Sequence, residues 1–381
     1  VGPVVTLDNI SSTDEVWAWV THGLVPTLSG SASRPGFVCT FNQVLGKVRL
    51  RQSRKSVGKC QVEGPLAAYF RGECRTDAAS GTAFGAAALS AAGSVPVDPS
   101  FVAGSGMAGL SEEDQSRFFG WLDARRQGEA QARAAQLAAR GWCDDVTSEM
   151  AVQAAFFNAE VQAFTMVTIM FTFESGGLVR SNLEVSPLST KIYPTAWYVL
   201  VDIAWLILIT AFFFLAAQEA FDKRAGSVAS RCFGSGWIIL DWVSIVAGLA
   251  VVGFFAFFLS HLGDLERKVG SLGGSLAPAT ATTMASNTTA VLAYDGNLSG
   301  VIDDLDWLIW FKANHRLGMF WYCMLLLCRF FRGFTGQPRI HLIGLTLEKA
   351  CADITHFGIL LLAICENFAL GGCVLFGSEL A

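Results

Sequence analysis

Two arginines follow an apolar stretch in the last quarter of the chain. Leu317–Cys328 carries no charge, and Arg329 and Arg332 come after it. Because residues three apart share one face of a helix, the two guanidinium groups should lie side by side. A charge at membrane depth is costly unless it faces protein or reaches the interface, so the pair indicates a role such as voltage sensing. Basic residues also anchor the cytoplasmic ends of membrane helices, and this stretch alone favours neither role.

Acidic residues interrupt three further apolar stretches, one in each: Asp202 in Trp197–Ala217, Asp241 in Trp237–Leu259 and Glu366 in Ile354–Phe376. Each stretch exceeds the roughly 20 residues that a helix needs to cross a bilayer core. At that depth a carboxylate should face another helix, water or a basic side chain. Asp241 is expected to pair with Arg329 or Arg332, or to hold a cation, and a structural pair is favoured.

The composition indicates a membrane protein. Of the 381 residues, 52% are hydrophobic and 15% are charged, and the mean hydropathy is +0.44. With Leu317–Arg332 as a fourth span, all membrane candidates lie in the second half of the chain. The net charge of −5 argues against a nucleic-acid binder, because phosphate neutralisation needs a basic surface.

No motif predicts an enzyme or a metal centre. The histidines and cysteines show no metal-ligand spacing, and no P-loop, nucleophile elbow or HExxH motif occurs. Gly104–Gly109 formally matches the GxGxxG dinucleotide fingerprint, but neither a preceding strand nor a βαβ unit is visible. We therefore expect no catalysis, no bound metal and no cofactor.

The first half has the patterns of an α+β domain. Ser12–Glu15 has capping-box spacing, and apolar residues at helical intervals up to Leu28 predict a helix. Leu45–Arg54 alternates apolar and basic residues, which predicts a strand whose basic face is solvated or forms local ion pairs rather than binding an anion. Val167–Phe173 alternates with a period of two, so Val152–Phe173 should end in a half-buried strand and not form a fifth span.

Two segments of this half are predicted from composition. Ala78–Ser105 is rich in alanine, glycine and serine, which suggests an irregular excursion. Ser111–Arg140 begins with acidic residues and continues as a charged, alanine-rich stretch, which predicts a surface helix.

The cysteines of the first half predict a disulfide. Cys60 and Cys74 bracket a short loop, and closing a loop of that length is worth about 3 kcal/mol in the chain-entropy model. Cys39 and Cys143 are the other two cysteines of this half, and four cysteines allow three connectivities. The pairing of Cys60 with Cys74 is therefore a prediction, and it requires an oxidising, extracellular location.

Charge and glycosylation signals give one orientation. Basic residues are dense after the first span and after Arg329, and sparse between Ser260 and Arg316, so the two short loops should be cytoplasmic. The glycosylation acceptors all fall on the opposite side: Asn9, Asn287 and Asn297. Residues 1–196 are therefore expected outside the cell. Since no signal peptide begins the chain, a membrane-entry segment is expected upstream.

Taken in order, the motifs of this chain resemble those of the polycystin family of transient receptor potential cation channels. The residues that carry the resemblance run along almost the whole chain: Val16–Leu28 with its two tryptophans, Leu45–Arg54 before Cys60 and Cys74, Trp142 with Asp144, Phe157–Ala159, Phe173 with Gly176–Gly177, Trp237 with Asp241, Arg329 with Arg332, and Leu375–Gly377. The segment from Gly263 to Ile302 and the Ala/Gly-rich excursion depart from the family pattern.

The resemblance implies an α-helical membrane bundle, with voltage-sensor-like helices and the first pore-domain helix, carrying a large extracellular α+β polycystin domain. The implied parts are the domain at 1–196, a helical region at 197–334 (spans 197–217, 237–259 and 317–332, extracellular loop 260–316), a cytoplasmic linker at 335–353 and a fifth membrane helix at 354–377. The pore helix, selectivity filter and sixth helix of the family are absent from these residues and would follow Ala381.

The resemblance also implies a function. The chain is similar to subunits of calcium-permeable, non-selective cation channels in ciliary or flagellar membranes. Such channels are assembled as homotetramers or with a polycystin-1-like subunit. Arg329 and Arg332 would then take the family's basic gating positions. The alternative is a membrane-anchored adhesion or tethering protein whose glycosylated domain binds an extracellular polymer or glycoprotein. A transporter is third, because no internal repeats of membrane segments are visible.

Overall fold

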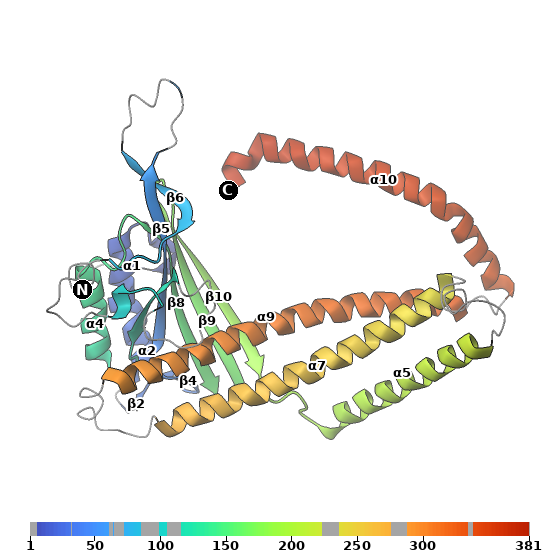
Figure 1. The fold of residues 1–381 in the computed structure, drawn as a ribbon, viewed down its shortest axis with the longest axis horizontal. Helices are drawn as coiled ribbons and strands as arrows, with labels where there is room; N and C mark the ends of the chain where they lie inside the picture. Colours follow the sequence, from blue (N-terminus) through green and yellow to red (C-terminus); the bar gives the residue numbers. More distant parts are fainter. Residues whose placement is uncertain are drawn as a thin grey trace. The chain divides into compact units, whose positions relative to one another are not determined.

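The computed structural model describes residues 6–31, 33–60, 64, 72–84, 99–104, 116–222, 236–275, 288–333 and 338–380. Figure 1 shows the fold as a ribbon. The chain divides into two compact units: Val1–Ala196 with Ala256–Ala313, and Trp197–Phe255 with Asn314–Ala381. Two long helices, α7 (Gly236–Ser275) and α9 (Thr288–Gly333), contribute residues to both units.

An antiparallel sheet is the centre of the first unit. In the described part of the chain it has eight strands, in the order β10-β9-β8-β4-β3, and β5 pairs with β6, β7 and β8. The strands are β3 (Phe37–Val38), β4 (Asn42–Val44), β5 (Val48–Lys59), β6 (Glu73–Ala79), β7 (Phe118–Leu122), β8 (Thr147–Asn158), β9 (Ala163–Phe173) and β10 (Val179–Ser189). A separate two-stranded sheet joins β1 (Gly30–Ser31) to β2 (Arg34–Pro35).

Strand β9 confirms the period-two prediction. Ile169, Phe171 and Phe173 are buried on one face of the sheet, while Phe164 and Met166 are buried on the other. Because side chains alternate across a strand, both faces of β9 carry a hydrophobic layer. The segment is therefore a central strand of the sheet and not a membrane span.

Helices near the start of the chain cover one face of the sheet (Figure 1). They are η1 (Leu7–Asn9), α1 (Thr13–Trp19), η2 (Val20–Leu24) and α2 (Val25–Ser29), with α4 (Gln127–Ala139) beside them. The Ser12 hydroxyl accepts a hydrogen bond from the Glu15 amide at 3.4 Å, and the Glu15 carboxylate accepts one from the Ser11 amide at 2.7 Å. The predicted cap is thus present, with its return bond shifted by one residue.

The opposite face of the sheet is covered by the ends of α7 and α9 that belong to the first unit. Their buried residues pack with those of the sheet in one cluster: Phe258, Leu262, Leu265, Leu272, Leu298, Val301, Ile302, Leu305 and Leu308 with Phe164, Met166 and Leu188. Residues 260–316, expected as a loop, are therefore largely helical. Apolar residues at helical spacing on both segments account for the difference.

Two other sequence predictions need correction. Ser111–Arg140 was expected as one helix, but β7 and then α4 occupy its described part. Phe118, Phe119 and Leu122 are buried, and pairing of β7 with β5 overrides the local helical preference. The irregular excursion holds strand β6 up to Ala79 and the short helix η4 (Pro99–Phe101), while Gly104–Gly109 lies almost wholly outside the described residues.

The second unit is helical. It contains α5 (Ala196–Asp222), the remaining parts of α7 and α9, and α10 (Pro338–Leu380). Within the described residues, three helices are long and apolar enough to cross a membrane, over Ala196–Gln218, Ile238–Gly273 and Asp353–Leu375. The expected span at Leu317–Arg332 lies in α9 and is not among these three, because its apolar run is short and arginines flank it. The expected linker at 335–353 is mostly helical and continues into the last span as part of α10.

Candidate functional site

An arginine–aspartate pair lies between two of the apolar helices. The Arg329 Nε of α9 is 2.9 Å from the Asp241 Oδ1 of α7, and only 20% and 8% of these side chains are exposed. The pairing that the sequence left open between Arg329 and Arg332 thus forms with Arg329. Because an isolated charge in this apolar setting is very costly, the pair neutralises both groups.

Two further side chains contact Arg329. Its Nη1 donates a hydrogen bond of 3.3 Å to the Ser244 hydroxyl, one turn beyond Asp241 on α7. Its guanidinium carbon lies 4.2 Å from the centroid of the Phe212 ring on α5, which is cation–π geometry. Side chains of α7 and α5 thus contact the guanidinium group that α9 carries. The sequence did not single out Ser244 or Phe212; the spacing of Ser244 from Asp241 was a usable signal, and nothing marked Phe212 among its neighbouring phenylalanines.

The other charges at membrane depth lie on α5, α9 and α10. Asp202 and Glu366 are exposed on α5 and α10. Arg332 lies at the end of α9, but its side chain is outside what the structure describes. Only the backbone thus places Arg332 on the Arg329 helix.

The basic face predicted for strand β5 is covered, not solvated. Arg49 is 1% exposed and lies 2.7 Å from Asp303 of α9. It also donates to the Ser299 hydroxyl at 2.7 Å and to the Gln153 side-chain oxygen at 2.9 Å. The expected ion pairing occurs, but with a helix distant in sequence and not with local residues. The acidic residues of α9, in a segment taken for a loop, were the missed signal.

A second contact lies beside the first. Lys47 Nζ is 2.6 Å from Asp295 Oδ1 and 5.6 Å from the centroid of the Tyr294 ring. Burial raises the pKa of Asp295, and Lys47 only partly offsets this. Burial likewise raises the pKa of Tyr294 to about 12 and the pKa of Asp306, near Arg51 and Arg49. Strand β5 and helix α9 are therefore joined by charge pairs that have lost much of their water.

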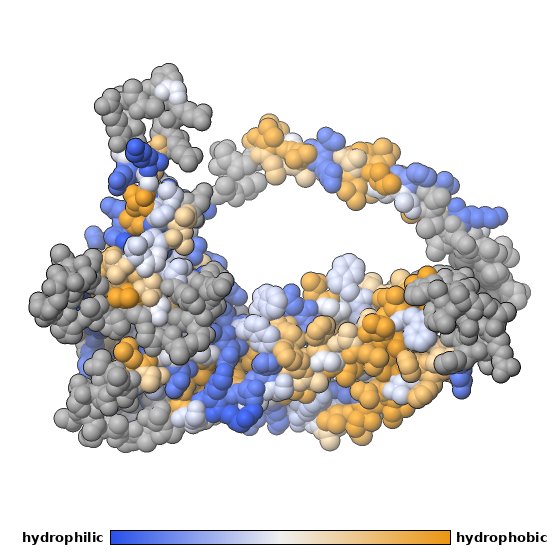
Figure 2. Space-filling model, in the orientation of Figure 1, coloured by the Kyte–Doolittle hydropathy of each residue, from blue (hydrophilic) through white to orange (hydrophobic). Residues whose placement is uncertain are grey.

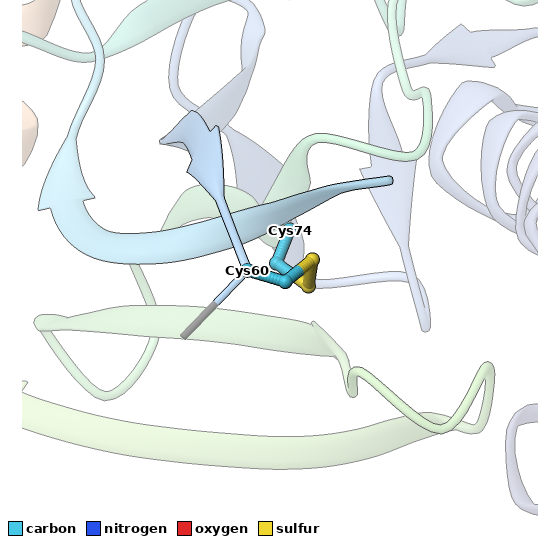
Figure 3. The surroundings of a disulfide bond; sticks show 2 residues. All are labelled: Cys60 and Cys74. Carbon is cyan, nitrogen blue, oxygen red and sulfur yellow. A yellow bond between two sulfur atoms is a disulfide. The ribbon is translucent and has the colours of Figure 1, made fainter. Parts of the chain in front are cut away.

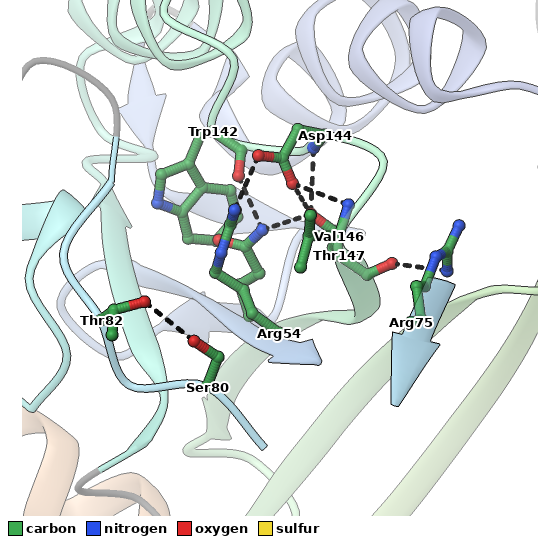
Figure 4. A network of polar contacts seen from close by, with 9 residues as sticks. Arg54, Arg75, Ser80, Thr82, Trp142, Asp144, Val146 and Thr147 are labelled. Atoms are coloured by element: carbon green, nitrogen blue, oxygen red, sulfur yellow. Dashed lines mark hydrogen bonds and ion pairs between the residues drawn. The ribbon is translucent and has the colours of Figure 1, made fainter. Parts of the chain in front are cut away.

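A polar network further along β5 ties the strand to the loop before β8 (Figure 4). Gln52 donates to the Trp142 carbonyl oxygen at 2.7 Å and to the Thr147 hydroxyl at 2.6 Å. Arg54 pairs with Asp144 at 2.7 Å and lies 3.7 Å from the centroid of the Phe84 ring. These contacts tie β5 to the loop before β8 and have a structural role, although the buried Gln52 Oε1 and Arg54 Nη1 atoms have no hydrogen-bond partner among the described residues.

The predicted disulfide joins Cys60 at the end of β5 to Cys74 in β6 (Figure 3). The two strands are also paired there, with Gly58 opposite Cys74. Cys39 is a free, exposed thiol and Cys143 is a free, buried one. Of the three possible connectivities, the structure thus contains the predicted pairing and leaves the other two cysteines unbonded.

The glycosylation acceptors occupy different settings. Asn9 is exposed in η1 and Asn297 is exposed on α9, while Asn287 lies outside the described residues. Ser299, the third residue of the Asn297 acceptor motif, is buried against Arg49. Modification of the three asparagines stays a prediction.

Residues 6–83 match the family model of the polycystin domain. This part of the chain therefore contains a polycystin domain. The resemblance seen in its motifs is thereby confirmed. The match includes Lys47 and Arg49, which pair with acidic residues of α9, as well as Arg54 and both cysteines of the disulfide.

The polycystin match and the helices together give the coarse architecture. The chain has a sheet-rich polycystin domain and helices that can cross a membrane. Among the described residues, the Arg329–Asp241 pair places two opposite charges between helices that are rich in apolar side chains. In the described residues no group of three or more histidine, cysteine or acidic side chains is arranged to hold a metal ion.

Proposed function

We propose that this polycystin chain is a subunit of a tetrameric, non-selective, calcium-permeable cation channel of a ciliary or flagellar membrane. The observation that carries the proposal is the buried Arg329–Asp241 pair in the helices of a polycystin-family chain. In this assignment Arg329, with Arg332, senses voltage, and Asp241 is its partner in the conformation described here. No cofactor is needed, and calcium is a permeating ion.

The electrostatics support this role. Moving one elementary charge across the membrane potential is worth about 2.3 kcal/mol per 100 mV, so one or two arginines in each of four subunits bias opening strongly. Removing one partner of a buried ion pair costs about 3–5 kcal/mol, because the other charge is left unpaired. Arg329 can therefore leave Asp241 at low cost only where another partner or water receives it. The pair thus defines one of two states between which voltage selects.

The polycystin domain supports the proposal through α9. This single helix carries Arg329 near one end, and Asp295 and Asp303 near the other. Lys47 and Arg49 hold that second end against the sheet. The domain is thus a fixed support for the helix that bears the sensing charge, and a movement of α9 has to be accommodated at these contacts.

The partners and location complete the proposal. The channel would assemble from four copies of this chain or with a polycystin-1-like subunit, in contact with lipid. Residues 1–196 would be extracellular, consistent with a disulfide in the domain and with acceptors for N-glycans at Asn9, Asn287 and Asn297. A nucleic-acid partner is not expected for a chain of net charge −5.

The test is electrophysiology of the full-length protein that contains this chain. We expect a cation current with a conductance–voltage curve that shifts when Arg329→Gln is introduced. Arg316→Gln is the matched control, because Arg316 is an exposed arginine of the same helix, and it should leave the curve within a few millivolts. A full-length protein that reaches the surface without carrying current would reject the channel; a current with an unchanged curve in Arg329→Gln would reject the sensing role.

A tethering function is the second candidate, and one observation favours it. Strand β10 lies at the edge of the sheet, and Leu183 and Val185 on it are 52% and 54% exposed. Exposed apolar residues on an edge strand suit a protein partner. Replacing both residues by serine should weaken attachment to an extracellular glycoprotein and leave the current intact; unchanged attachment would argue against this role.

A further inference from the structure

Helix α7 is longer than a bilayer is thick. Its 40 residues extend about 60 Å at the usual rise of ~1.5 Å per residue, about twice the thickness of a hydrocarbon core. The apolar window within it, Ile238–Gly273, is still 36 residues long. Part of this window must therefore stand outside the lipid, and the residues on α7 and α9 show where the boundary lies.

Charge defines one limit of the membrane. From Ile238 to Leu259 the only charged residue is Asp241, while the stretch Asp264–Lys268 holds four charges. Two exposed ion pairs form there: Lys268 with Asp304 of α9, at 2.5 Å, and Arg267 with Asp264. Exposed charge pairs require water, so the lipid ends before Asp264. Figure 2 shows the same change, with hydrophobic side chains over the helices and hydrophilic ones where α7 and α9 run beside the sheet.

An aromatic cluster lies next to this limit. Phe257 and His261 of α7 have ring centroids 4.3 Å apart, and His261 is 5.1 Å from Trp307 of α9. Trp307 stacks on Phe311 at 5.1 Å. One turn of each helix thus contributes to a continuous aromatic surface in the first unit.

The cluster faces outward. Phe257 is 45% exposed and Trp310, on the next turn of α9, is 60% exposed. Phe258 and Leu308, adjacent in sequence to outward residues, are buried. On both helices, the side that faces the sheet is therefore covered by the sheet. The aromatic side chains that point away from the sheet form a separate surface. Lys312 follows directly, with its Nζ 3.4 Å from the Pro187 carbonyl oxygen.

We propose that Phe257, His261, Trp307, Trp310 and Lys312 form a binding surface for the headgroup and glycerol layer of phospholipids, in the leaflet on the side of the polycystin domain. Tryptophan rings prefer this layer because they are apolar with one polar group, and a lysine amine beside them can reach lipid phosphate. The apolar part of α7 that lipid can cover is then at most Ile238–Leu259, about 33 Å, and His315 of α9 lies against its Val251 carbonyl oxygen at 3.4 Å. The rest of α7 stands in water against the sheet.

The proposal rests on the chain being a membrane protein and not on conduction, so failure of the channel assignment leaves it intact. The test uses the full chain in nanodiscs of phosphatidylcholine brominated either near the carbonyl end or near the methyl end of the acyl chains. Subtracting the fluorescence of Trp310→Phe from that of the wild type isolates the emission of Trp310. The conservative change is at an exposed position, so folding is retained.

We expect carbonyl-end bromolipid to reduce the Trp310 emission at least twofold more than methyl-end bromolipid, with little quenching by aqueous iodide. Phe41→Trp is the control: Phe41 is 54% exposed on the polycystin domain, so the added emission should respond to iodide and not to bromolipid. Strong iodide quenching of Trp310 would place it in water and overturn the proposal. Strongest quenching by the methyl-end lipid, or quenching by neither agent because protein covers the ring, would overturn it equally.

Discussion

Arg49 of strand β5 and Asp303 of helix α9 form an ion pair of 2.7 Å in which the arginine is almost completely buried. The two residues are far apart in the sequence, and the buried Arg49 guanidinium would destabilise the fold without a counter-charge. The same guanidinium also bonds to Ser299 and Gln153, so it binds the helix and the sheet at once. The helix that carries Arg329 is therefore fixed to the polycystin domain by a charge that water does not reach.

Asp303→Asn should destabilise the protein by about 1–3 kcal/mol, because it leaves the buried Arg49 guanidinium without its counter-charge. The apparent Tm of the chain in nanodiscs measures this. Asp304→Asn is the matched control: Asp304 pairs with an exposed lysine, and such surface pairs contribute about 0–1 kcal/mol. Equal losses in the two variants would show that the Arg49 contact is not a fixed point of the fold.

Gly46→Ala should lower stability for two reasons that act together. Gly46 has φ +69°, and an added Cβ would lie 2.8 Å from the Tyr294 hydroxyl and 2.9 Å from a Leu298 methyl. The left-handed backbone alone costs a non-glycine residue about 1–2 kcal/mol. Gly128→Ala in α4 should instead stabilise by about 0.5–1 kcal/mol, since its Cβ meets nothing within 4 Å. Thermal unfolding of the pair measures both; a neutral Gly46→Ala would mean that α9 does not pack on this turn.

Thiol labelling should separate the cysteines of the domain. Cys39 is exposed and should react with iodoacetamide in the native protein, whereas Cys143 is buried beside Met150, at 3.5 Å between the sulfurs. Burial raises the pKa of the Cys143 thiol well above its ordinary value, so the reactive thiolate is scarce. Mass spectrometry should find Cys60 and Cys74 labelled only after reduction. Native labelling of Cys143, or of both Cys60 and Cys74, would contradict the structure.

The contribution of Asp295 to the stability of the folded protein should be larger at acidic pH than at neutral pH. Burial raises its folded pKa above the unfolded value, so the contribution is present below the unfolded pKa, near 4, and is lost as the pH rises through the folded pKa. Asp295→Asn removes this dependence. The Tm of the wild type minus that of the variant should therefore be most favourable near pH 4 and decline toward pH 7. A difference that grows with pH would mean that Lys47 outweighs burial at this carboxylate.

Local patterns predicted the parts of the fold that local physics controls. The capped helix after Ser12 and the alternation in β9 follow directly from side-chain periodicity, and the disulfide from loop length and location. The prediction of a loop at 260–316 was wrong because packing on the sheet stabilises the helices of this segment. The sheet residues that provide this packing are distant in sequence, so the local pattern does not reveal them. The prediction of a helix where strand β7 lies was wrong for the same reason, because its partner strand β5 is far away in sequence.

The residues of the candidate site also fall into those that local sequence patterns predicted and those that they did not. Charges at membrane depth identified Arg329 and Asp241, because an apolar background makes a charge conspicuous. Which of the two arginines meets Asp241 depends on helix rotation, which the sequence does not set. Arg49 looked like a solvated residue on an alternating strand, since its partners Ser299 and Asp303 belong to a segment whose helical structure was not foreseen. Position in the fold, more than residue type, separates a surface charge from a buried one.

The most direct test of the central claim is a charge exchange at the Arg329–Asp241 pair, measured on the current that we propose for this protein. Conductance–voltage curves are recorded for Arg329→Asp, Asp241→Arg and the double exchange. We predict that each single change shifts the midpoint strongly or abolishes the current, because two like charges then meet among apolar helices, and that the double exchange recovers current with a midpoint nearer the wild type than either single variant. A double variant as impaired as the sum of the singles would contradict the pairing as a gating contact.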